Sequence, residues 1–165
     1  MPFQTTVNVQ PAPGQPGDFA AANPRNSSLA GPGALVAGPG GITVGRFGWV
    51  DATVTYVSNA QIGTTPPNGF LHRGSHQQLI TAYLAETGGV LPQGFEVTLH
   101  SEGDFWAATK TATTYGQKVF ASTTDGTVST GAAGALITGS IETKWYCYSV
   151  QAIGEVIKIS TTAPF

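Results

Sequence analysis

Apolar and polar residues alternate along much of the chain after residue 41, which is the pattern of half-buried β-strands. The stretch ITVGRFGWVDATVTYVS is rich in Val, Ile, Thr and aromatic residues, which suit a pleated surface, and predicts one long or broken strand over residues 42–58. Alternation places Phe47 and Trp49 on one face and Ile42 and Val44 on the other. Because neither face is purely polar, we expect both to be covered.

The same texture, interrupted by turn signals such as SEGD, TTDG and AIGE, continues to the C-terminus. It predicts seven short strands, over residues 95–100, 105–110, 118–123, 127–131, 136–143, 144–151 and 155–161. Between them and the first strand, SHQQLITAYLAE has helical spacing and predicts one short helix over residues 75–86. Strands at intervals of roughly 8 to 12 residues indicate an all-β fold, with a compact β-sandwich or barrel-like body.

The first 41 residues have a different composition. Seven of the eleven prolines lie there, and with the many glycines they disfavour regular structure. Single apolar residues, among them Phe19 and Leu35, are dotted along this segment, as in extended chains that lie in a groove on another surface. The sequence therefore predicts an extended N-terminal arm over residues 1–41 and a β-rich body over residues 42–165.

The number and distribution of charged residues argue against some classes of function. Charged residues make up 10% of the chain and the formal net charge is -2, against roughly 25% charged residues in an ordinary domain. No basic stripe could neutralise a nucleic-acid backbone, and no long apolar run could cross a membrane, so we expect neither partner. The single Cys147 excludes an internal disulfide and a multi-cysteine zinc site, and we expect it to be a buried apolar side chain.

Groups for catalysis are few. His72 and His76 are four residues apart, but Gly74 makes a shared helix face unfavourable and no third ligand follows. His100 lies beside Asp104 in a turn-like segment without a nucleophile motif, and the glycine clusters lack the features of a phosphate loop. The sequence predicts no catalytic site, no cofactor and no metal, and hence a protein that is not an enzyme.

Several segments resemble one known family. PGDFAAANPR (16–25), LVAGPGGITVGRFGWVD (35–51), GFLHR (69–73), QQLITAYLAE (77–86) and PQGFEVTLHSEGDFW (92–106) are similar, in this order, to the cement or decoration proteins of tailed-phage capsids. The resemblance covers most of residues 16–126. Beyond residue 126 only the general β texture matches.

The resemblance implies a structural protein of the virion, made in the bacterial host cytoplasm and bound to the outer surface of the capsid. There it would bridge neighbouring major capsid protein subunits, as a homo-oligomer (dimer or trimer), and stabilise the shell. The residues that it marks for contact with the capsid or a sister subunit are Pro16, Gly17, Asp18, Phe19, Asn23, Pro24, Arg25, Arg46, Phe47 and Trp49. We add Leu29, an apolar residue of the arm, to these predicted contact residues. For Phe47 and Trp49, packing in the body's own core is an equally good interpretation.

Two other interpretations remain open at the level of sequence. A carbohydrate- or receptor-binding β-sandwich module of a phage tail or spike could use Trp106, Trp145 or Tyr83 to stack on a sugar ring. A small hydrolase would need His100, Asp104 and Asp125 to meet in one site.

Overall fold

The computed structural model describes residues 14–74 and 88–165, which form thirteen β-strands and no helix. The all-β prediction is confirmed, and the helix expected over residues 75–86 lies outside the described residues. The strands are β1 (Asn26–Ser27), β2 (Val36–Ala37), β3 (Ile42–Thr43), β4 (Phe47–Val50), β5 (Tyr56–Ser58), β6 (Gly69–Leu71), β7 (Val90–Leu91), β8 (Leu99–Glu102), β9 (Asp104–Ala108), β10 (Lys118–Ser122), β11 (Val128–Gly131), β12 (Ser140–Cys147) and β13 (Val156–Ser160).

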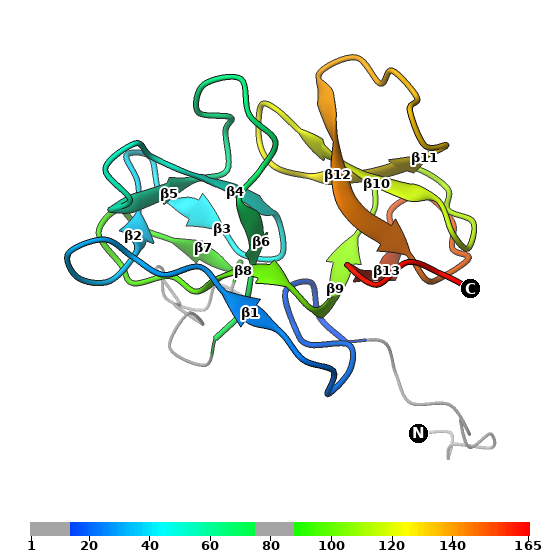
Figure 1. The fold of residues 1–165 in the computed structure, drawn as a ribbon, viewed down its shortest axis with the longest axis horizontal. Coiled ribbons are helices and arrows are strands. Elements are labelled where there is room, and N and C mark those ends of the chain that lie inside the picture. Colours follow the sequence, from blue (N-terminus) through cyan, green and yellow to red (C-terminus); the bar gives the residue numbers. More distant parts are fainter. Residues whose placement is uncertain (1–13, 75–87) are drawn as a thin grey trace, which may run out of the picture.

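The strands form two lobes that lie side by side (Figure 1). The first lobe holds a six-stranded sheet in the order β1-β8-β6-β4-β5-β2 and a small antiparallel pair, β3-β7. The second lobe holds a five-stranded sheet in the order β11-β10-β12-β13-β9. Only Gly103 separates β8 from β9, so the chain passes from one lobe to the other within a single residue.

The second lobe closes on itself. After β9 the chain turns so that Thr109 bridges Val128 of β11, which is the opposite edge strand. The Lys110 amide donates to the Val128 carbonyl at 2.8 Å, and the Thr130 amide donates to the Thr111 hydroxyl at 2.8 Å. Because these contacts join the two edges of the five-stranded sheet, the lobe is barrel-like, which is one of the two architectures that the strand spacing predicted.

Both faces of the six-stranded sheet are buried, as the alternation predicted. On the face toward the second lobe, Phe47, Trp49 and Phe70 pack against Phe105 and Trp145, and none of these side chains is more than 2% exposed. Each buried aromatic side chain removes roughly 150–250 Å² from water. This cluster is therefore the contact that holds the two lobes together.

The opposite face packs under the small β3-β7 pair. Leu71, Leu99 and Val57 lie there with Leu91, all fully buried. Gly48 of β4 points toward this cluster, and a Cβ atom at that position would lie 2.7 Å from the Val57 side chain. A larger residue at position 48 would push the sheet away from its cover.

The segment 42–58 is broken into three strands. The first break falls at Gly45, which has a φ of +72°, and the second at Asp51, whose carboxylate accepts the amide hydrogens of Thr53, Thr55 and Tyr56. Burial raises the pKa of Asp51, but these hydrogen bonds outweigh it and the net pKa lies below the usual range.

The prediction of separate strands over residues 136–143 and 144–151 was wrong, because one strand, β12, replaces both. The residues before it form a loop in which Leu136 is fully exposed, whereas Ile137 packs on the barrel, where it and the ring of Phe120 both lie beside Gly131. Within β12, Trp145 is in the core, while Tyr146 faces outward under the ammonium of Lys118 at 3.8 Å.

Candidate functional site

Residues 14–41 lie against the rest of the chain. Gly17–Ala20 runs along the outer edge of β9, where the Gly17 amide donates to the Trp106 carbonyl at 2.8 Å and the Trp106 amide donates to the Asp18 carbonyl at 2.9 Å. Further on, β1 pairs with β8, and Leu35 belongs to the second core cluster. This segment thus completes both lobes and leaves the β9 edge covered.

Two glycines allow the close approach. Gly17 has a φ of +96°, and a Cβ atom there would lie 2.9 Å from the Cβ atom of Arg73. Gly45 has a φ of +72°, and its Cβ would lie 2.7 Å from the main chain of Pro16. The PGDF and TVGRF segments therefore face each other, and a side chain at either glycine would force them apart.

Phe19 anchors this segment. Its ring stacks on His72 with the centroids 4.0 Å apart and packs against Phe105 and His100 at 5.2 and 5.5 Å. The guanidinium of Arg25 lies 3.9 Å above the same ring, a cation–π contact. These four partners come from four places in the sequence, and together they clamp the ring from both sides.

His100 is the most deeply buried ionisable group of this cluster. Its Nδ1 atom lies 3.1 Å from the Ser27 hydroxyl, and its Nε2 atom has no hydrogen-bond partner among the described residues. Burial, followed by the nearby charges of His72 and Arg25, lowers the pKa of His100 to about 4. The ring is therefore neutral at pH 7.

Polar contacts flank the cluster on both sides. Asp18 forms an ion pair with Arg73 at 3.8 Å, and the Asn23 amide donates to the Asp104 carboxylate. We call residues 16–25, held in this way, the N-terminal clasp. The arrangement consists of packing and charge contacts, and it holds one segment of chain in a fixed place.

From residue 21, in the second half of the clasp, the chain lies on the surface. Nearly all of residues 21–34 are exposed, including the predicted contact residues Asn23, Pro24, Arg25 and Leu29, of which Leu29 is 88% exposed. We call residues 21–34 the surface segment. It carries a single charged side chain, that of Arg25.

The remaining predicted contact residues lie elsewhere. Phe47 and Trp49 are completely buried, so their side chains do not reach the surface of this chain and pack in its core. Arg46 lies between the lobes and forms an ion pair with Asp125 at 3.4 Å.

Sequence reasoning missed Val54 as a neighbour of the surface segment. Val54 is 39% exposed and has a φ of 55°, which is strained for a β-branched residue. Its carbonyl accepts the Gly31 amide at 2.9 Å, so the strained loop is tied to the surface segment near Leu29. No pattern in the sequence signals this contact, because the two residues belong to separate loops.

Most of the residues named for the two alternative interpretations lie in the described part of the chain. Trp145 is buried, Trp106 is partly covered by Lys158, and Tyr83 lies outside the described residues. Of the carboxylates named for a hydrolase, Asp104 accepts a hydrogen bond from the Asn23 amide, and Asp125 forms an ion pair with Arg46.

The part of the chain that the structure describes also holds no group of three or more His, Cys, Asp or Glu side chains that could bind a metal ion. In residues 14–74 and 88–165 there is no helix of the length and hydropathy needed to cross a bilayer.

The model of the XM1 gp53 minor capsid protein family matches residues 3–161. The chain belongs to this family. It is a capsid component of a phage virion, with a structural role in the shell. A chain in the solved capsid of Myoviridae phage XM1 has the same fold, with a TM-score of 0.62 and 19% sequence identity over 98% of each chain. Among curated proteins, none matches.

Proposed function

We propose that this minor capsid protein is a cement protein: it binds the outer surface of the phage head, bridges neighbouring major capsid protein subunits and stabilises the shell without catalysing a reaction. The observation that carries the proposal is the surface segment, which is exposed, poor in charge and anchored at its start by the N-terminal clasp. Membership of a minor capsid protein family supports it.

The clasp favours binding because it orders the surface segment in advance. Fixing a backbone residue costs roughly 1–2 kcal/mol, and a segment that is already ordered does not lose that entropy when it binds. Side chains without charge also lose little hydration when they are buried in an interface. Leu29, which is exposed and lies near the strained Val54 loop, is the apolar side chain that we place at the centre of the contact.

A homo-oligomer, dimer or trimer, would strengthen this attachment. In an oligomer, binding of one subunit raises the effective concentration of the others at the lattice, so several weak contacts together give a high overall affinity. The low charge of the chain fits a protein partner better than nucleic acid, since nucleic-acid binding needs clustered cations.

Co-sedimentation with expanded, undecorated capsids tests the proposal. The natural chain should bind saturably, and Leu29→Ser should weaken binding by about tenfold, as for an apolar residue at an interface centre. Ile153→Ser is the matched control, because Ile153 is 69% exposed on a different loop and should bind like the natural chain. Absence of binding by the natural chain refutes the cement function, and equal binding by all three proteins refutes the role of Leu29.

A further inference from the structure

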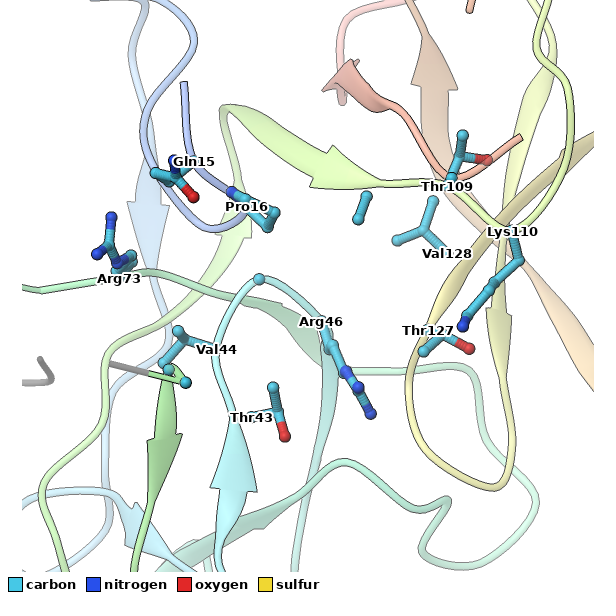
Figure 2. Close-up of a pocket in the computed structure, with 15 residues that line it drawn as sticks. Gln15, Pro16, Thr43, Val44, Arg46, Arg73, Thr109, Lys110, Thr127 and Val128 are labelled. Carbon is cyan, nitrogen blue, oxygen red and sulfur yellow. The ribbon is translucent and has the colours of Figure 1, made fainter. Parts of the chain in front are cut away.

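A pocket of about 380 Å³ lies between the two lobes, away from the surface segment. One wall consists of residues 43–46, which lead into β4 of the first lobe, and the facing wall comes from residues 108–110 and 127–128 of the barrel (Figure 2). Three of the chain's seven cationic side chains line it, and none of the described lining residues carries a carboxylate. In a chain with a net charge of -2, this is a local concentration of positive charge.

Two of these cations, Arg46 and Lys110, point toward each other across the pocket, whereas Arg73 is turned away (Figure 2). Arg73 is already engaged by Asp18. Arg46 and Lys110 come from different lobes, so an anion between them would contact both halves of the molecule at once.

Arg46 has hydrogen-bonding capacity to spare. Its Nη1 atom donates to the Asp125 carbonyl at 3.3 Å and to the Asp125 carboxylate at 3.4 Å, and the other guanidinium nitrogens have no partner among the described residues. Asp125 is itself engaged by the Thr127 amide and hydroxyl at 3.3 and 2.8 Å. Asp125 thus orients Arg46 and leaves the free edge of the guanidinium for a second carboxylate, the geometry that Arg prefers.

The ammonium group of Lys110 is available to bind a ligand in the pocket. Its main-chain amide is held by Val128 in the barrel seam, but no hydrogen bond or ion pair joins its ammonium group to a described residue. Asp125 pairs with Arg46 from outside the pocket lining and compensates its charge, so Lys110 leaves one positive charge in excess among the described residues. One further carboxylate would neutralise it and would receive hydrogen bonds from both lobes.

We propose that the interlobe pocket binds an Asp or Glu side chain of a neighbouring protein chain in the shell, held between Arg46 and Lys110. The inference rests on the proposed function, because the carboxylate is supplied by the lattice that the protein decorates. It adds a second, charged contact to the apolar contact of the surface segment. This contact would weaken as salt increases, since exposed charges are screened.

The first test uses the isolated protein, so that it does not depend on capsid binding. N-acetyl-glutamate N-methylamide is titrated into the 15N-labelled protein at constant ionic strength, alongside its glutamine analogue and inorganic phosphate. We expect saturable shifts of the Arg46, Lys110 and Thr127 amide signals with the glutamate derivative alone, and their loss in Lys110→Gln. Lys158→Gln is the control, because Lys158 lies on the outer barrel face over Trp106.

Three results would overturn the proposal: no saturable shift, equal shifts with the glutamine analogue, or equal or larger shifts with phosphate, which would mark a site for free anions. In the co-sedimentation assay Lys110→Gln should bind capsids about tenfold more weakly than Lys158→Gln, as for loss of one charged interface partner. Equal capsid binding by the two variants also overturns it. If the natural chain binds no capsids while the titration succeeds, the cement function fails and the carboxylate pocket remains.

Discussion

Acidification should destabilise the protein through His100. The folded pKa of this residue is about 4 and its ordinary value is 6.5, so between these two pH values the unfolded chain binds more protons than the folded one. Stability therefore rises with pH in this window, and it is lost as pH falls from 6.5 toward 4. The cause is burial of the ring in the Phe19 cluster, with His72 and Arg25 adding positive charge beside it.

The size of the effect follows from the two pKa values. Going from roughly pH 7.5 to pH 5, one group with this shift removes about 2 kcal/mol from the free energy of unfolding. Asp51 and Asp125 contribute little to the loss of stability between roughly pH 7.5 and pH 5. Their ordinary pKa of 3.8 lies below this pH range, and their pKa values in the folded protein are lower still. A domain of ordinary stability would lose a substantial part of its free energy of unfolding.

Urea unfolding at several pH values, followed by the fluorescence of the buried tryptophans, measures this loss. His100→Phe is the informative variant, since a phenyl ring suits the aromatic surroundings and cannot titrate. It also removes the buried Nε2 atom that lacks a partner in the described structure. The variant should lose about 2 kcal/mol less than the natural chain over the same pH range. Equal losses in the two proteins would refute the argument, because the remaining histidines are common to both.

Three other perturbations test the packing. Gly45→Ala should lower the free energy of unfolding by about 1–3 kcal/mol more than Gly63→Ala in urea titrations, because both glycines have a φ of 72° but only Gly45 has main-chain atoms within 3 Å of an added Cβ. Deleting residues 1–41 should give a chain that fails to unfold cooperatively by circular dichroism, since it removes β1, β2 and part of the second core cluster. Burial raises the pKa of the Cys147 thiol, so a thiol reagent should modify it only after denaturation, and rapid modification of the native protein would contradict this.

Local alternation accounts for the part of the fold that sequence could predict. The strands expected over residues 118–123 and 155–161 correspond to β10 and β13, since each is a short run rich in β-branched and other apolar residues between clear turns. The same reasoning failed at residues 136–143. There Ile137 packs on the outside of the barrel beside Gly131 while its neighbour Leu136 is fully exposed, and such a loop has the same local sequence pattern as a strand.

The contacts of the clasp could not be predicted, because they join residues far apart in the chain. His72 is bonded to the Gly17 carbonyl across 55 positions, and Asn23 is bonded to Asp104 across 81. The sequence indicates His72 as a possible metal ligand and His100 as a turn residue or a catalytic group, and neither as part of an aromatic cluster. Nothing in the residues around them indicates an aromatic partner in the N-terminal segment.

The glycine-centred parts of the motifs and the contact surface that we propose involve different residues. The segments that resemble phage cement proteins, PGDF and TVGRF, face each other through Gly17 and Gly45 and leave no room for a side chain, so their composition is explained by packing within the chain. A motif of this kind identifies the fold, because the fold cannot form without it. The exposed side chains lie on the surface segment, which begins in the second half of the PGDFAAANPR motif and continues past it. Variants meant to break attachment without unfolding the protein should therefore change Leu29 rather than Phe19.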